Sequence, residues 1–291
     1  MAMSHYLLDI RWEEKNDKVD VLLKPGSSPE MTALEAGLEA QVFQIVPDEE
    51  ENSLVLKIWN RDSRPDIRRQ YKLLELLHSY GMPVSRPLGW GYDLNGNQVL
   101  LTPYDGAPVT RLGAAVVRKL AKMLTDIHKL PVDTEFGDLL PEYDFMSYFY
   151  PSIDQHEDIK RLLIPLLERA NLNHHSVIHG DFNLGNVLEQ EGQYKIIDWT
   201  NGQLGDARYD IAWSVVVMRI FAGERNAAVY RAACLSATAY TDEELELFEA
   251  IATLRGVLLS RGSDLLKGKD MMKRVRNILN ENKYLTSDVI V

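Results

Sequence analysis

The stretch that decides the fold runs from Ile178 to Trp199 and reads IHGDFNLGNVLEQEGQYKIIDW. It places Asp181, then Asn186 five residues later and Asp198 twelve residues after that, between two short runs rich in β-branched residues. Phosphoryl transfer needs a carboxylate near the acceptor hydroxyl, oxygen ligands for a metal ion and a cation on the phosphates. This stretch supplies the first two and therefore predicts a phosphoryl-transfer site.

Each of these side chains has a predicted role. Asp181 follows an apolar strand and lies in a loop, where its carboxylate can accept a hydrogen bond from an incoming hydroxyl, so we interpret it as the catalytic base. Asn186 and Asp198 carry oxygen ligands of the kind that Mg²⁺ prefers, and we interpret them as the metal residues. Taken singly, an Asp or Asn in a loop is usually a turn former, and only the combination favours function.

Lys57 is the candidate cation. It lies inside LVLKIW, residues 54–59, the most hydrophobic strand pattern of the first third of the chain. An unpaired buried ammonium is costly, and phosphate oxygens would supply its anionic partner. A lysine in a strand is more often an edge residue or one that extends its charge to the surface. Together with the downstream motif, we interpret Lys57 as a phosphate-binding residue.

Composition and charge limit the class of protein. The 291 residues are 45% hydrophobic and 26% charged, which is typical of a globular protein with a substantial core. The net charge of −11 opposes a nucleic-acid partner and is compatible with a cationic small molecule, although acidic surpluses also serve solubility. No apolar stretch approaches the roughly 20 residues of a membrane helix, so we expect a cytoplasmic protein without a membrane partner. Cys234, the single cysteine, excludes an internal disulfide.

Hydrophobic periodicity changes near residue 103. Period-two patterns predict strands at residues 33–36, 41–46, 54–59, 87–92 and 98–102, with one helix over 64–80 that stops at Gly81. Helical patterns follow at residues 111–130, 155–170, 209–222, 227–240, 242–260 and 265–280. We therefore predict an α+β fold with an N-terminal five-stranded antiparallel sheet and one helix over residues 1–102, and a mostly helical C-terminal part over 103–291.

The motif residues, in this order and at this spacing, resemble the aminoglycoside phosphotransferase and choline kinase family, which shares the two-lobed fold of protein kinases. The strongest elements are residues 179–186, residues 197–199 and the segment GDARYDIA at 205–212, which is similar to the family's Gly-Asp-Pro-x-x-Asp-Leu-Ala with Ala207 in place of proline. The resemblance covers most of the chain from Thr32 onward. It implies a nucleotide-binding lobe over residues 1–102 and a catalytic, acceptor-binding lobe over 103–291.

The resemblance also implies an activity. The chain would be an ATP-dependent kinase, with GTP as the alternative donor, that transfers the γ-phosphate to a hydroxyl of a small molecule. Asp181 would be the catalytic Asp, Mg²⁺ would bind Asn186 and Asp198, and Lys57 would contact the α and β phosphates. Asp210 would brace the catalytic loop, whereas the histidines at positions 128 and 179 match family patterns without chemistry.

Three nucleotide-site features depart from the family pattern. The loop at residues 35–41 has one glycine, so Gly37 is its only candidate for contact with phosphate. The glutamate that would pair with the strand lysine is missing at the matching position, and Glu75 is the substitute, with Gln70 as the alternative. At the hinge, we expect adenine to meet the Thr102 carbonyl and the Tyr104 amide.

The shared motif does not distinguish acceptors, and an aminoglycoside-like antibiotic or an amino alcohol is the leading expectation. Acidic residues of the helical part could receive an ammonium group, and aromatic residues there could stack on it. These residues are Glu142, Asp144, Asp154, Glu157, Glu224, the run 242–246, Tyr143, Tyr148, Tyr150 and Trp213. An inactive nucleotide-binding module is the alternative from another class, and a protein kinase ranks lower because its activation-segment motifs are missing.

Overall fold

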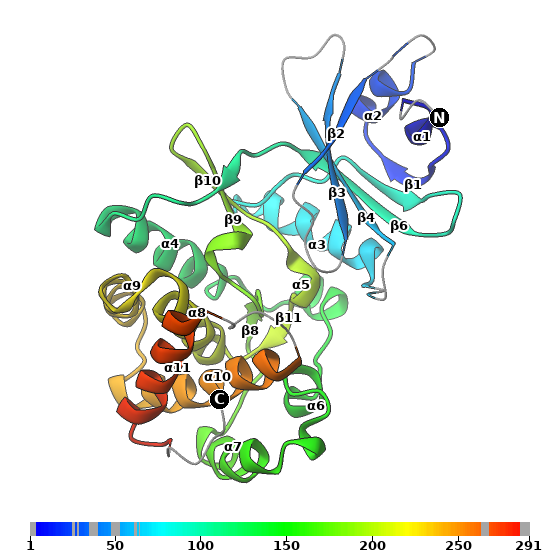
Figure 1. The fold of residues 1–291 in the computed structure, drawn as a ribbon. Coiled ribbons are helices and arrows are strands. Elements are labelled where there is room, and N and C mark those ends of the chain that lie inside the picture. The colour runs from blue at the N-terminus through cyan, green and yellow to red at the C-terminus, as the bar shows by residue number, and fades with distance from the viewer. Residues whose placement is uncertain are drawn as a thin grey trace. The chain divides into compact units, whose positions relative to one another are not determined.

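The computed structural model describes residues 4–24, 27, 29–34, 40–47, 53–60, 63, 65–262 and 268–285. The chain divides into two compact units (Figure 1). Unit 1 comprises Met1–Pro108 together with Val187–Thr200, and unit 2 comprises Val109–Asn186 together with Asn201–Val291. The assignment of residues 1–102 and 103–291 to nucleotide and acceptor binding stays a prediction.

A six-stranded antiparallel sheet forms unit 1, with strand order β1-β5-β6-β4-β3-β2. Its strands are β1 (Arg11–Lys15), β2 (Glu30–Ala33), β3 (Gln41–Val46), β4 (Leu54–Trp59), β5 (Gly89–Tyr92) and β6 (Gln98–Pro103). The predicted α+β class and antiparallel N-terminal sheet are confirmed, but the predicted number of five strands is wrong by one. The additional strand is β1.

The sequence of β1, RWEEK, explains why hydrophobic periodicity does not predict this strand. Only Trp12 is apolar, and the strand pairs with the glycine-rich β5. A Cβ on Gly91 would lie 2.2 Å from the carbonyl oxygen of Arg11, so the close approach of the two backbones requires glycine there. The strand therefore depends on its partner's lack of side chains rather than on its own alternation.

In the described part of unit 1, three helices accompany the sheet, namely α1 (Ser4–Leu8), α2 (Asp17–Leu22) and α3 (Ile67–Ser79). Only α3 was expected, and it ends beside Gly81, whose φ of +74° favours glycine. The side chain of Asp66 caps its first turn by accepting from the Arg69 N–H. Leu7, Val19 and Leu22 from the two shorter helices join Leu56 and Val99 of the strands in one buried cluster. The sheet face therefore has a more extensive helical cover than predicted.

Residues 187–200 also belong to unit 1, and they contain part of the motif. The strands β7 (Ala107–Pro108), β9 (Val187–Gln190) and β10 (Gln193–Ile196) form a small sheet in the order β10-β9-β7. Gly106 precedes it with a φ of +99°, and a Cβ there would lie 2.1 Å from the Glu189 carbonyl oxygen. The Ile196 N–H donates to the carbonyl of Pro83 at 2.7 Å. These contacts carry Asp198 into the unit that contains Lys57.

Unit 2 is mostly helical, as its periodicity predicts. Its helices are α4 (Ala114–Ile127), α5 (Thr134–Leu139), α6 (Phe145–Phe149), α7 (Glu157–Ala170), α8 (Ala207–Ala222), α9 (Glu224–Ala237), α10 (Asp242–Gly262) and α11 (Lys269–Glu281), with short 3₁₀ turns at Ile153–Gln155 and Leu184–Asn186 and a further one at Trp199–Asn201 on the boundary of the units. The short helices α5 and α6 were not predicted.

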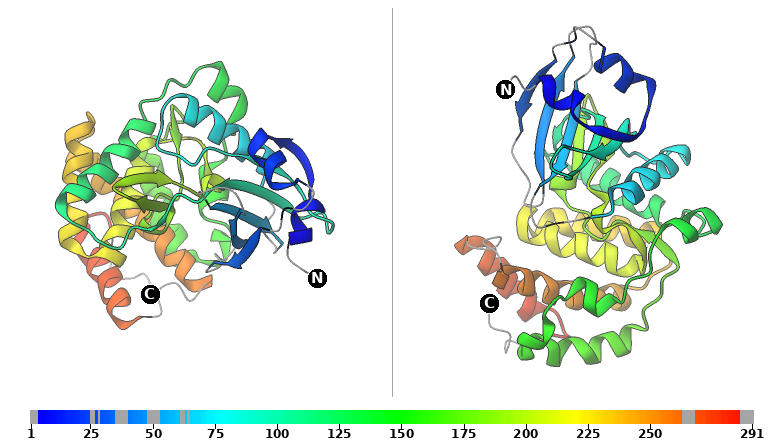
Figure 2. Two further views of the ribbon diagram at one scale, coloured as in Figure 1. Left: turned by 90° about the horizontal axis from the view of Figure 1, so that it is seen from above. Right: turned by 90° about the vertical axis from the view of Figure 1, so that its right-hand side faces the viewer.

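Two strands of unit 2, β8 (Ser176–Ile178) and β11 (Gln203–Gly205), pair antiparallel, and the loop that carries Asp181 follows β8. Most residues of α8 are buried, because α8 packs against α9 and α10 (Figure 2). Among the described residues, no helix combines the length and apolar content that a membrane span requires.

Candidate active site

The loop that follows β8 is tied to helix α8 by Asp210. Its carboxylate is fully buried and accepts hydrogen bonds from the backbone N–H groups of His179 at 2.8 Å and Gly180 at 2.9 Å. His128 Nε2 lies 3.0 Å from the same carboxylate. Burial alone would raise the pKa of Asp210, but the hydrogen bonds from His128 and from the His179 backbone hold that pKa below its usual value. An ionised Asp210 therefore fixes the loop backbone.

Gly180 has a conformation and surroundings that exclude a side chain. Its φ is +76°, and a Cβ would lie 2.8 Å from the backbone oxygen of Asn201. A larger residue would therefore be strained and would also collide with the backbone of the next loop. The position directly before Asp181 therefore requires glycine.

The structure brings Asp181 and Asn186 together. The Asn186 Nδ2 group donates to the Asp181 backbone oxygen at 2.9 Å and lies 3.2 Å from its carboxylate Oδ2. The indole Nε1 of Trp213 donates to the other carboxylate oxygen, Oδ1, at 2.8 Å. Trp213 was expected as a stacking surface for the acceptor, and this hydrogen bond was missed. Its position three residues after Asp210 on the same helix, and so on the same face, was the available signal.

Within unit 1, the structure brings Lys57 and Asp198 together. Their side chains form an ion pair of 3.4 Å, with exposed fractions of 20% and 35%. Thr200 Oγ1 donates to Asp198 Oδ1 at 3.0 Å. Asp198 has a φ of +63°, a strained conformation for a residue other than glycine, of the kind that concentrates at functional sites. The pair is accessible enough to exchange partners with a charged ligand.

The other predicted nucleotide contacts are placed differently. Glu75 Oε2 forms an ion pair of 3.0 Å with Lys72, whereas the side chain of Gln70 is buried and its Oε1 has no hydrogen-bond partner among the described residues. Lys72 also bonds Glu14, so Glu75 shares this cation with a second carboxylate. Gly37 lies outside the described residues.

The hinge is integrated into the sheet. The Tyr104 N–H donates to the Ser53 carbonyl at 2.9 Å, and Thr102 stands opposite Val55 in the register of β6 with β4. Because hydrogen-bonded pairs alternate along an antiparallel ladder, the two groups expected at adenine are turned toward β4. The carbonyl of Pro103, at the intervening position, points away from that strand.

Each of the two predicted metal residues carries an oxygen of the kind that magnesium prefers. Among the described residues, no cluster of three or more His, Cys, Asp or Glu side chains could hold a metal. Asp198 offers a carboxylate, and the amide of Asn186 has its nitrogen turned to Asp181, which leaves its oxygen end for other partners. Mg²⁺ takes few protein oxygens and completes its shell with phosphates and water.

Many acidic residues of unit 2 already have cationic partners. Ion pairs join Asp154 to Lys160, Glu224 to Arg219, Asp242 to Arg231, Glu243 to Arg169, Glu244 to Arg208 and Glu246 to Lys283. The charge available to a cationic acceptor is therefore smaller than the sequence suggests.

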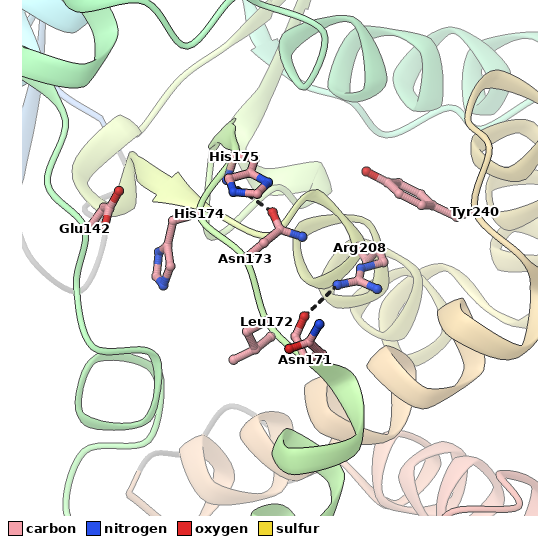
Figure 3. A pocket seen from close by; sticks show the side chains of 8 residues that line it. All are labelled: Glu142, Asn171, Leu172, Asn173, His174, His175, Arg208 and Tyr240. Atoms are coloured by element: carbon pink, nitrogen blue, oxygen red, sulfur yellow. Dashed lines mark hydrogen bonds between the residues drawn. The ribbon is translucent and has the colours of Figure 1, made fainter.

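A separate polar pocket of about 670 Å³ lies at the start of β8 (Figure 3). It is lined by Glu142, Asn171, Leu172, Asn173, His174, His175, Arg208 and Tyr240. Arg208 bonds Asp206, Glu244 and the Asn171 carbonyl. Its guanidinium therefore stabilises the region where α7, β8 and α8 meet. Glu142 is the candidate acceptor-binding residue in this lining. Asp181, the predicted base, does not line the pocket.

Solved structures share this fold at low sequence identity. The amicoumacin kinase hAmiN, determined with AMP-PNP and Ca²⁺, is 17% identical, with 90% of each chain covered and a TM-score of 0.64. The ethanolamine kinase of Plasmodium vivax is 14% identical, covers 90% of this chain and 89% of its own, and has a TM-score of 0.62. A thermostable aminoglycoside phosphotransferase APH(4)-Ia with AMP-PNP and hygromycin B is 15% identical, covers 88% and 95%, and has a TM-score of 0.63.

No curated protein matches the chain. Residues 30–248, about three quarters of the 291, match the phosphotransferase enzyme family. This match confirms the resemblance seen in the motifs and the predicted enzyme class, a kinase of small molecules. With the fold, the Asp181 loop and this match in agreement, the chain belongs to the phosphotransferase enzyme family.

Proposed function

We propose that the protein transfers the γ-phosphate of ATP to a hydroxyl group of a small molecule, with Asp181 as the catalytic base. The observation that carries this proposal is the support of the Asp181 carboxylate, one of whose oxygens accepts from Trp213 while the loop backbone is bonded to Asp210. A base must be held in place to orient an incoming hydroxyl, and these contacts do so.

In the proposed reaction, Lys57 binds the α and β phosphates, and the hinge at Thr102 to Tyr104 receives the base of the nucleotide at the Pro103 carbonyl, which points away from β4. The Lys57 ammonium is positioned by Asp198 and is partly exposed, so phosphate oxygens can reach it. Asn186 and Asp198 would hold Mg²⁺, which when bound neutralises negative charge on the phosphate oxygens. Asp181 accepts a hydrogen bond from the acceptor hydroxyl and takes its proton as the oxygen attacks the γ-phosphorus, while the bond from that phosphorus to the β,γ-bridging oxygen breaks and ADP leaves.

For the acceptor, we propose an aminoglycoside-like antibiotic or an amino alcohol. The support is the family membership together with the net charge of −11. The candidate acidic residues of unit 2 give little further support, because six of the nine form ion pairs with cations of the same unit.

The test is acceptor-dependent release of ADP by the purified protein with Mg²⁺ and ATP, or GTP, against aminoglycosides, amicoumacin, macrolides, choline, ethanolamine and small sugars. We expect turnover of at least one amine-bearing acceptor, and Asp181→Ala should lower kcat about 10²- to 10⁴-fold. Asp126→Ala, at a partly exposed carboxylate of α4, is the control and should keep full activity. Binding of ATP without turnover of any acceptor would favour the inactive regulatory module instead.

A further inference from the structure

A buried arginine lies behind the proposed base. Arg255, on α10, has an exposed fraction of 7%. Its Nη1 donates to the Gly180 carbonyl at 2.9 Å and to the Tyr209 hydroxyl at 3.3 Å. In the described part of the chain, the Nε of Arg255 has no hydrogen-bond partner. A guanidinium buried in this way is costly, and its contacts are a carbonyl, a phenol and aromatic rings rather than a carboxylate.

The guanidinium lies over two aromatic rings. Its central carbon lies 4.1 Å from the ring centre of Trp213 and 4.5 Å from that of Phe149. Trp213 is itself buried, with an exposed fraction of 5%, and its Nε1 donates to Asp181 Oδ1. The arginine therefore contacts the ring that bonds the base, and the carbonyl one residue before the base.

From this arrangement we infer that Arg255 and Trp213 are positioning residues for Asp181. Arg255 holds the loop through the Gly180 carbonyl and fixes the plane of the indole by stacking on it. The indole N–H then directs one carboxylate oxygen, and it does so at any physiological pH because it does not titrate. The pair determines where the base lies relative to the acceptor hydroxyl, and neither residue touches the acceptor in this role.

This inference rests on the proposed function for its kinetic consequence, but the contact itself can be tested without any acceptor. The five tryptophans permit ¹⁵N-tryptophan labelling with assignment of each indole signal by a Trp→Phe variant. Asp181→Asn should shift the Trp213 indole signal and leave that of Trp90 unchanged, and Arg255→Met should shift the Trp213 signal as well. A Trp213 signal that is insensitive to both variants would overturn the inference.

The kinetic arm compares Trp213→Phe with Trp90→Phe, using an acceptor identified in the screen. Trp90 is also buried, and its Nε1 also donates to a carboxylate, that of Glu14 at 3.3 Å. Both variants keep an aromatic ring and lose one indole donor. Trp213→Phe should lower kcat about 10- to 100-fold with the nucleotide KM within about twofold, whereas Trp90→Phe should leave kcat unchanged.

Arg255 variants separate positioning from simple packing. Arg255→Lys keeps the charge but lacks the planar group that stacks on both rings, so it should fail to restore the kcat lost in Arg255→Met. A lysine variant with normal kcat, or equal kcat in Trp213→Phe and Trp90→Phe, would overturn the inference. If the wild type turns over no acceptor, the proposed function fails while the indole signals still decide whether Arg255 and Trp213 hold Asp181.

Discussion

The Asp181 loop in unit 2 and the Lys57–Asp198 pair in unit 1 are supported in opposite ways. Asp210, which holds the loop, is fully buried and accepts two backbone N–H groups besides its contact with His128. The Lys57–Asp198 pair is partly exposed and its atoms are 3.4 Å apart. The loop is therefore organised by the protein's own buried network, whereas the pair is loose enough to be reorganised by a nucleotide and a metal ion.

The largest expected effect is on the buried side of this comparison. Asp210→Asn should lower the free energy of unfolding by about 3 kcal/mol, because it removes a charge on which three donors converge in the interior. Asp198→Asn is the matched control and should cost less than about 1 kcal/mol, since its ion pair is partly exposed and asparagine tolerates a positive φ. Urea unfolding of both variants measures the difference, and equal losses would remove the contrast between the two regions.

The same variant has a pH signature. The pKa of Asp210 is lower in the folded state than its unfolded value of about 3.9, so its ionised form stabilises the fold above that pH. This contribution is lost as the pH falls through the folded pKa. The stability gap between wild type and Asp210→Asn should therefore shrink as the pH falls below about 4. A gap that persists undiminished to pH 3 would contradict the assignment of the charge.

Gly180 offers the next test, with Gly96 as its control. Their φ values are +76° and +77°, but a Cβ on Gly180 meets the backbone of Asn201, whereas one on Gly96 meets nothing within 4 Å. Gly96→Ala should cost about 1 kcal/mol for the backbone conformation alone. Gly180→Ala should cost about 1 to 2 kcal/mol more, because the collision adds strain. Thermal unfolding of both variants measures the two losses of stability. Equal losses would mean that the loop shifts to accommodate a Cβ at position 180.

Much of the fold could be predicted from the sequence because elements such as β4 and α3 each bury a face with the period of their own secondary structure. The strand β1 could not, since its pairing depends on the glycines of β5 rather than on its own residues. The roles proposed for Asp181, Asn186 and Asp198 come from residue types and spacing along the chain. Their supports are contacts between distant segments, such as Arg255 with Gly180, and no local pattern indicates those.

The smallest expected change in stability is at Lys57, where the effect should fall on ligand binding. Lys57→Met should leave the free energy of unfolding within about 1 kcal/mol of wild type, because the ion pair that it breaks is partly exposed. It should weaken AMP-PNP binding about 10- to 100-fold, the loss expected for a charged hydrogen bond to phosphate.

Lys72→Met removes a lysine of the same unit that pairs with Glu14 and Glu75, and it should change the AMP-PNP affinity less than about threefold. Calorimetric titration of both variants distinguishes the two lysines. Equal losses of affinity would mean that the general positive charge of the unit attracts the nucleotide. A strongly destabilised Lys57→Met variant would mean that the ion pair with Asp198 stabilises the fold rather than serving to bind a ligand.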